Sequence, residues 1–194
     1  MIGFKSRRRM AVSLFFSNFL SDIRCCLVLD AGGVRFGGRK SVGESHLQNA
    51  VVFNLDKRMK PDIVGDLSDL PFKESIFDMV ICSEVMEHLR DPERVLGNLS
   101  SVLKKGGTLL FSMPLHYPIH GDPGDFQRWT YSKISYAFED KGFEVQAAYA
   151  NGGLLDVIFD FIYFRLYVGS KMSLISSLAL KIFWRFVVIY NLYT

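Results

Sequence analysis

Short apolar runs that end in an aspartate, or lead directly to one, constrain the fold of this chain more than any other feature. The run at 25–30 reads CCLVLD, the run at 50–55 reads AVVFNL and precedes Asp56, and the short run at 62–64 leads to Asp66. A run that is apolar on both faces is typical of a buried strand in a parallel sheet. We therefore predict a buried strand at each of these three positions.

Predicted helices alternate with predicted strands along the rest of the chain. Apolar residues recur at helical spacing over 92–103, and this helix is expected to end at 104–107, where two lysines precede two glycines. The other expected elements are strands over 76–82, 108–113 and 143–149 and helices over 83–89 and 131–141. This alternation favours an α/β fold that is Rossmann-like and doubly wound around a mostly parallel sheet.

The two ends of the chain differ in composition from its middle. Residues 1–24 hold five basic side chains and only one acid, and they predict a basic amphipathic helix. Serine and asparagine residues interrupt the apolar stretch of this helix, so a secretion signal is disfavoured. Residues 25–150 form the predicted domain. Residues 151–194 predict an apolar helical extension, in which charges recur too often to leave the ~18 apolar residues that span a bilayer.

The charge distribution and the cysteines indicate which binding partners and which cellular compartment to expect. Removing the five basic groups and one acid of residues 1–24 from totals of 23 and 20 leaves 18 basic and 19 acidic groups. Residues 25–194 are therefore nearly neutral, whereas a nucleic-acid-binding domain usually carries an excess of basic residues on one face. We expect no nucleic acid partner. The three cysteines show no paired spacing, which fits a reducing, cytoplasmic compartment. Basic residues beside apolar segments favour peripheral contact with the inner membrane through 1–24 and 154–194.

The acids that follow the predicted strands indicate a ligand site. Ligands of open α/β sheets bind at the carboxyl ends of the strands. There, Asp56 can accept the hydroxyl hydrogens of a ribose, and Asp66 can accept from the exocyclic amine of adenine. The stretch at 31–43 has five glycines in thirteen residues, which lets backbone N–H groups meet the polar end of a ligand. Together these features predict a nucleoside-containing cofactor, although any one such acid could be only a helix N-cap.

Successive motifs in this order resemble those of the class I S-adenosylmethionine-dependent methyltransferases. They are VLDAGG at 28–33, Asp56, GDLSDLPF at 65–72, FDMVICSEVMEHLRDP at 77–92 and LKKGGTLLFSMP at 103–114. The resemblance covers about residues 25–150 and implies S-adenosylmethionine as the cofactor. Residues 31–36 depart from the family's D-x-G-x-G pattern. The family's seventh, antiparallel strand has one late candidate, FVVIY at 186–190, so we expect 154–194 to be helices alone, with this strand lost by truncation.

The resemblance also implies a role for each matching residue. The carboxyl of Asp56 would bind the ribose and that of Asp66 the adenine amine. The remaining cofactor-binding residues are Asp30, Gly32 and Gly33 at the amino-acid portion, Leu67 at the adenine ring, and Cys82 and Ser83 at the methionine end.

The segment that follows the fifth predicted strand carries the candidate acceptor site. Residues 116–130 read HYPIHGDPGDFQRWT and combine general bases, a guanidinium and aromatic surfaces. This arrangement resembles a subgroup of the family associated with cell-surface polysaccharides. The expected substrate-binding residues are His116, Asp125, Arg128 and Trp129, and the expected catalytic bases are His120 and His88.

Two other interpretations of this segment stay open. An Arg128–Asp125 pair and a Trp129 anchor could simply order the loop. His116, His120, Asp122 and Asp125 could bind a metal, but no helix is expected across the prolines to give the histidines a defined spacing, so we expect no metal.

The function that these features favour is methyl transfer from S-adenosylmethionine to a small-molecule, saccharide or lipid-linked acceptor. The alternative from another class is a non-catalytic Rossmann-like module that binds a nucleoside or a partner protein, which the altered glycine loop favours. A dehydrogenase is disfavoured because the chain lacks the G-x-G-x-x-G fingerprint of dinucleotide-binding folds.

Overall fold

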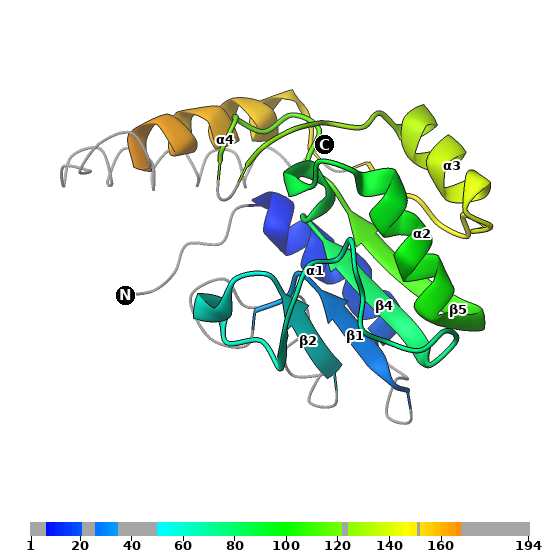
Figure 1. Ribbon diagram of the computed structural model, residues 1–194. Helices are drawn as coiled ribbons and strands as arrows, with labels where there is room; N and C mark the ends of the chain where they lie inside the picture. The colour runs from blue at the N-terminus through cyan, green and yellow to red at the C-terminus, as the bar shows by residue number, and fades with distance from the viewer. Residues whose placement is uncertain (1–6, 21–25, 35–49, 122–123, 151, 168–194) are drawn as a thin grey trace. The chain divides into compact units, whose positions relative to one another are not determined.

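The computed structural model describes residues 7–20, 26–34, 50–121, 124–150 and 152–167. Its centre is a five-stranded sheet of order β3-β2-β1-β4-β5 in which every neighbouring pair is parallel (Figure 1). The strands are β1 (Val28–Ala31), β2 (Ala50–Asn54), β3 (Ile63–Val64), β4 (Phe77–Ser83) and β5 (Leu103–Ser112). The predicted Rossmann-like α/β fold is therefore confirmed, and all five strands present their carboxyl ends at one edge.

Helices cover both faces of the sheet because successive strand residues point to opposite sides. On one face, Leu29 of β1 and Val80 of β4 share a buried cluster with α2 (Pro92–Val102) and α3 (Tyr131–Asp140). On the other face, Val28 and Ile81 pack with α1 (Arg7–Leu20). Such burial on both faces explains why the strands read as continuous apolar runs.

The N-terminal helix contributes directly to the core. Phe16 and Leu20 of α1 are almost fully buried in the cluster that contains Ala50 and Leu110 of the sheet. A helix whose apolar residues pack on a sheet gains about 1.5–3 kcal/mol for each large side chain that it buries. The apolar residues of 7–20 therefore serve the fold of the sheet.

Helix α2 begins where the sequence signals predict it. Asp91 is the N-cap and accepts a hydrogen bond from the backbone N–H of Arg94 at 3.1 Å, and Pro92 occupies the first turn. The helix buries one apolar stripe, formed by Val95, Leu96, Leu99 and Val102. It ends at Val102, and Leu103 already has extended backbone angles. Strand β5 thus starts five residues earlier than predicted, with its pairing to β4 shifting between Phe77 and Met79.

Two other predicted elements are wrong. Residues 143–149 are not a strand: from residue 144 onward they are exposed, so no apolar face draws them to the edge of β5. Phe143 instead packs on Phe138 of α3, with ring centroids 5.6 Å apart. The helix expected over 83–89 is only a single 3₁₀ turn, η2 (Met86–His88), because residues 83–85 leave the strand through a turn in which Glu84 has a φ of 58°.

The chain divides into two compact units. Of the described residues, the first unit contains the sheet and takes those within 12–115 and 120–149, and the second takes those within 7–11, 116–119 and 150–167. In the second unit, the guanidinium of Arg8 lies 4.4 Å from the ring centroid of Tyr117, and Tyr117 contacts Phe164 of α4 (Leu154–Tyr167) at 5.9 Å between ring centroids. The seventh-strand candidate at 186–190 lies outside the described residues. Within the described part of the chain, no helix combines the length and the apolarity that crossing a membrane requires.

Candidate active site at the carboxyl edge of the sheet

The glycine turn after β1 is held in place by β2. Gly32 has a φ of +82° and donates its backbone N–H to the carbonyl of Phe53 at 2.8 Å. The carbonyls of Gly32 and Gly33 both accept from the side-chain amide of Asn54, at 3.0 and 2.9 Å. The predicted glycines thus form a fixed turn at the carboxyl end of β1.

The carboxyl group of Asp30 lies directly against this turn. Asp30 is 4% exposed, and a Cβ placed on Gly33 would lie 2.1 Å from its Oδ2. A side chain at position 33 would force the turn or the carboxylate to move, which is a physical reason for the second glycine. The pattern Asp30-x-Gly32-Gly33 therefore places a buried carboxylate against a tight glycine turn at the carboxyl end of β1.

Asn54 is a site residue that the sequence analysis missed. Besides its two donations to the glycine turn, its Oδ1 accepts from the backbone N–H of Asp56 at 2.9 Å. One amide thus links the turn after β1 to the acid after β2. The sequence did carry a signal for it, because Asn54 is the polar last residue of the otherwise apolar run AVVFN. A polar residue at that position lies at the carboxyl edge of the sheet, where ligands bind.

The carboxylate of Asp56 is organised by its own neighbour. It caps a 3₁₀ turn, η1 (Lys57–Met59), by accepting from the backbone N–H of Arg58 at 2.9 Å. The Nε of Arg58 also donates to Oδ1 and Oδ2, at 2.9 and 2.8 Å. These hydrogen bonds hold the pKa of Asp56 below its ordinary value, so the group is an ionised acceptor at neutral pH. A carboxylate has about four acceptor positions, of which the backbone cap uses one. The exposed side chain of Arg58 contacts the rest, so a ribose-binding role requires that side chain to move aside.

Asp66 follows β3 in a comparable local turn. Its Oδ1 accepts from the backbone N–H of Ser68 at 2.8 Å, and its carbonyl accepts from the N–H of Asp69 at 3.0 Å. The next residue, Leu67, is buried, and its carbonyl accepts from the side-chain amide of Asn98 on α2 at 2.9 Å. This turn is therefore fastened to the helix layer.

The two residues at the end of β4 differ in environment. Cys82 is fully buried in the cluster below α2, where burial and the charges of Glu87 and Asp30 raise the pKa of its thiol far above the ordinary value. It is therefore a neutral core thiol. Ser83 is half-buried, and its hydroxyl lies 2.8 Å from that of Ser112 at the end of β5.

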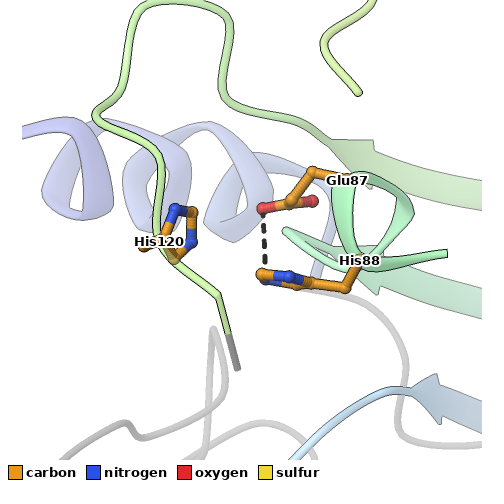
Figure 2. A group of neighbouring side chains, drawn as sticks. All are labelled: Glu87, His88 and His120. Carbon is orange, nitrogen blue, oxygen red and sulfur yellow. Dashed lines mark ion pairs between the residues drawn. The ribbon is translucent and has the colours of Figure 1, made fainter. Parts of the chain in front are cut away.

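Beside these strand ends, three side chains from two segments come together. Figure 2 shows Glu87 and His88 of η2 gathered with His120, which lies between β5 and α3; one ligand atom of each lies within 4.8 Å of the others. The Nε2 of His88 is 3.8 Å from Oε1 of Glu87, and the two imidazole rings meet edge to face at 5.1 Å. Both predicted bases are thus in the same place. The buried carboxylate beside them was missed, although the letters EH in the motif at 77–92 were a signal.

The segment 124–129 is joined to η2 by a set of hydrogen bonds. The backbone N–H of Phe126 donates to the carbonyl of Glu87 at 2.8 Å. The side-chain amide of Gln127 donates to the carbonyls of Met86 at 3.3 Å and Leu89 at 2.8 Å, and accepts from the indole N–H of Trp129 at 2.8 Å. Gln127 therefore connects η2 to this segment, another role that sequence analysis did not identify.

The predicted substrate-binding residues Asp125, Arg128 and Trp129 are strongly engaged within the protein. Arg128 forms a two-pronged pair with the carboxylate of Asp125, whose Oδ2 also accepts from the backbone N–H of His120 at 2.9 Å. These hydrogen bonds lower the pKa of Asp125 to about 2 and raise that of Arg128. Trp129 is 6% exposed in the core. The contacts fit the interpretation in which this pair and Trp129 order the segment. His116 belongs to the second unit.

The chain is similar in sequence to known methyltransferases. Residues 42–111 match a family model described as a methyltransferase domain. A malonyl-[acyl-carrier protein] O-methyltransferase from Herminiimonas arsenicoxydans is 29% identical over 153 residues, which is 73% of this chain and 57% of the relative. A ubiquinone biosynthesis O-methyltransferase from Coxiella burnetii is 44% identical over 36 residues, which is 19% of this chain and 15% of the relative. The chain thus spans 15% to 57% of the length of these relatives.

Solved structures share the fold. A SAM-dependent methyltransferase from Archaeoglobus fulgidus superposes with a TM-score of 0.54 at 16% identity, covering 79% of this chain and 85% of that one. At this identity the likeness shows the fold, a Rossmann-like methyltransferase fold. Together with the family match and the names of the relatives, it supports a class I methyltransferase domain with S-adenosylmethionine as its cofactor.

Proposed function

We propose that this chain transfers a methyl group from S-adenosylmethionine to a small-molecule or saccharide acceptor. The observation that carries the proposal is the placement of three aspartates at the carboxyl ends of three adjacent parallel strands. Asp30 is in β1, Asp56 follows β2 and Asp66 follows β3. In open α/β sheets this edge, beside the reversal of strand order between β1 and β4, is where ligands bind.

The residues at this edge fit the cofactor. Gly33 carries no Cβ where one would overlap Asp30, so the turn can pack against a carboxylate at the carboxyl end of β1. Asp56 is an ionised acceptor for the two ribose hydroxyls, and Asp66 is an acceptor for the adenine amine. Leu67 supplies apolar surface at the adenine ring. Charge-assisted hydrogen bonds of this kind are the stronger ones in proteins.

The chemistry requires positioning above all. S-adenosylmethionine, when bound, supplies an electrophilic methyl group on a sulfonium sulfur. The protein must then hold a nucleophilic atom of the acceptor in line with that methyl group, and such positioning provides much of the rate acceleration. For a hydroxyl acceptor a base must also take the proton, and the paired imidazoles of His88 and His120 lie beside the ends of β4 and β5 for this purpose.

The chemical identity of the acceptor is the finer part of the proposal. The relatives named above are O-methyltransferases, which favours an oxygen nucleophile here. The sequence HYPIHGDPGDFQRWT at 116–130, with its resemblance to a polysaccharide-associated subgroup, favours a saccharide. A hydroxyl-rich acceptor also matches a site with two imidazoles and a buried carboxylate, because these groups accept hydrogen bonds from hydroxyls.

Calorimetry on the full chain tests the proposal. We expect S-adenosylmethionine and S-adenosylhomocysteine each to bind with a dissociation constant below about 1 mM, which corresponds to about −4 kcal/mol. Failure of both to bind would overturn the proposal and favour the non-catalytic module. If both bind, incubation with a methyl-labelled donor and a panel of small saccharides measures transfer directly.

We also propose that the acceptor is linked to a lipid and that the chain contacts a membrane surface peripherally. Helix α4 supports this, because it exposes large apolar side chains, including Leu154 at 75% and Phe161 at 50%. Flotation of the full chain with anionic vesicles at low salt tests the idea. A chain that stays with the soluble fraction would remove the lipid from the proposal without affecting methyl transfer.

A further inference from the structure

The cluster of Glu87, His88 and His120 has the composition of a metal site. We propose that these three side chains bind one divalent transition metal ion, of which zinc is the representative. Two imidazoles and a carboxylate are a recurrent donor set for such ions, with three protein ligands and a fourth position left to water or substrate. The proposed set differs from the one considered from sequence, which joined His116, His120, Asp122 and Asp125.

The spacing of the three groups is close to that of a formed site. Their ligand atoms lie within 4.8 Å of one another, and the His88 Nε2 to Glu87 Oε1 distance is 3.8 Å. A tetrahedral ion held at ~2.1 Å by each ligand separates the ligand atoms by ~3.4 Å. Closing the site therefore needs movements of about an ångström or less in side chains that already face one another (Figure 2).

A hydrogen bond to His88 and a carboxylate beside His120 lie in the layer around the two imidazoles. Nδ1 of His88 contacts the carbonyl of Gly124, which can only accept, so this nitrogen carries the proton. Nδ1 of His120 lies 3.4 Å from Oδ2 of Asp125. Metal-ligating histidines almost always direct their second nitrogen to a backbone carbonyl or a carboxylate in this way. For His88 this arrangement directs Nε2 toward the carboxylate of Glu87, where the proposed ion would lie.

Charge and burial favour a cation at this point. Glu87 is 1% exposed, and a carboxylate removed from water is stabilised by a nearby positive charge. With His88 in the tautomer just described, its Nε2 lone pair and the Glu87 carboxylate are both electron donors separated by 3.8 Å. A metal ion between them would bind both at once. The competing arrangement is a protonated His88 that pairs with Glu87 without any ion, and metal binding distinguishes the two.

A metal here would change the role of the two histidines. Coordinated through Nε2, neither His88 nor His120 could act as a general base. A divalent ion instead lowers the pKa of a bound hydroxyl, which prepares it as a nucleophile near neutral pH. This consequence rests on the proposed function, whereas binding of the ion itself does not.

Titration of a tag-free, chelator-treated full chain with Zn²⁺, in the absence of S-adenosylmethionine, tests the site. We expect one ion per chain. His120→Ala and His88→Ala should each weaken binding by about 100-fold or more, because changes in the surrounding layer alone cost about 10- to 100-fold. Asp125→Asn, which alters only that layer, should weaken it by about 10-fold. Co²⁺ substitution should give the visible absorption bands of a four-coordinate ion.

The matched control is His116→Ala, which removes a histidine from the same sequence segment but not from the cluster. Its Zn²⁺ affinity should stay within about twofold of the parent, since a lost ligand costs far more. A parent chain that binds no Zn²⁺ below about 100 μM, a dissociation constant well short of ordinary structural or catalytic zinc sites, would overturn the proposal. So would an affinity that falls with His116→Ala but not with His88→Ala. Circular dichroism of each apo variant separates lost binding from lost folding, and cofactor calorimetry reports on the proposed function independently.

Discussion

The two sides of the carboxyl edge of the sheet are built by contacts of very different range along the chain. On the β2–β3 side, the carboxylates of Asp56 and Asp66 accept from backbone N–H groups two residues ahead, at 2.9 and 2.8 Å. On the β4–β5 side, η2 is joined to the segment around Gln127 by hydrogen bonds that cross 36 to 41 residues. On the first side local turns hold the two carboxylates, and one longer-range hydrogen bond, from Asn98 to the carbonyl of Leu67, fastens the second turn to α2. The second side exists only when distant segments meet.

This difference predicts which substitutions lower the stability of the protein and which weaken cofactor binding. Local turns contribute little to the free energy of unfolding, because each can form in a short stretch and be rebuilt with water. Buried long-range hydrogen bonds leave unpaired groups behind when one partner is removed, which costs about 1–3 kcal/mol for each group. We therefore expect changes on the β4–β5 side to destabilise the protein, and changes on the β2–β3 side to weaken cofactor binding while leaving stability nearly unchanged.

The largest effect on stability is expected at the glycine turn between the two sides. In Gly33→Ala, the new Cβ would lie 2.1 Å from Asp30 Oδ2, so the turn or the carboxylate must move. We expect a loss of about 3 kcal/mol in the free energy of unfolding, at the upper end for overpacking, together with loss of cofactor affinity. Urea denaturation measures the first and calorimetry the second.

Gly97→Ala is the control for that substitution. A Cβ at Gly97 in α2 would have only Lys141 Cδ within 4 Å, at 3.9 Å, and helical alanine is favoured over glycine by about 1 kcal/mol. This variant should be as stable as the parent or more so. Equal stability of the two alanine variants would contradict the tight fit of Asp30 on the turn.

An intermediate effect is expected at Gln127. Gln127→Ala removes donors to the carbonyls of Met86 and Leu89 and the acceptor for the Trp129 indole N–H. We expect the free energy of unfolding to fall by about 2 kcal/mol, since these groups are partly buried. Gln127→Glu keeps the acceptor and removes both donors, so it separates the two contributions. If the free energy of unfolding of Gln127→Ala differs from that of the parent by less than about 0.5 kcal/mol, the proposed difference between the two sides is wrong.

The smallest effect on stability is expected on the local side. Asp56→Ala should leave the urea midpoint unchanged and weaken binding of S-adenosylmethionine roughly 10- to 100-fold, as loss of charge-assisted hydrogen bonds to the ribose predicts. Arg58→Ala is the matched control, because it removes the exposed partner of Asp56 and leaves the carboxylate. It should alter affinity much less. An Asp56→Ala variant with unchanged affinity would show that the ribose is bound elsewhere.

The sequence predicted the β2–β3 side well because the relevant information is local there. Asp66 lies within GDLSDLPF and Asp56 follows an apolar run, and both are found where strands end. The prediction of a strand at 143–149 failed because residues 144–149 are exposed and do not pack on the sheet, which composition does not reveal. Asn54, Glu87 and Gln127 were missed for a related reason: their importance depends on partners that lie far away along the chain or across the sheet.

The sequence by itself determined the fold class, the positions of five parallel strands and the aspartates at their ends. These follow from apolar periodicity and from turn-forming residues, which act over a few positions. Only the tertiary structure decided how the glycine turn is held by Asn54, and which histidines share a site with Glu87. It also showed that Trp129 packs in the core. Those outcomes depend on packing and on the satisfaction of buried polar groups, which are properties of segments brought together in space.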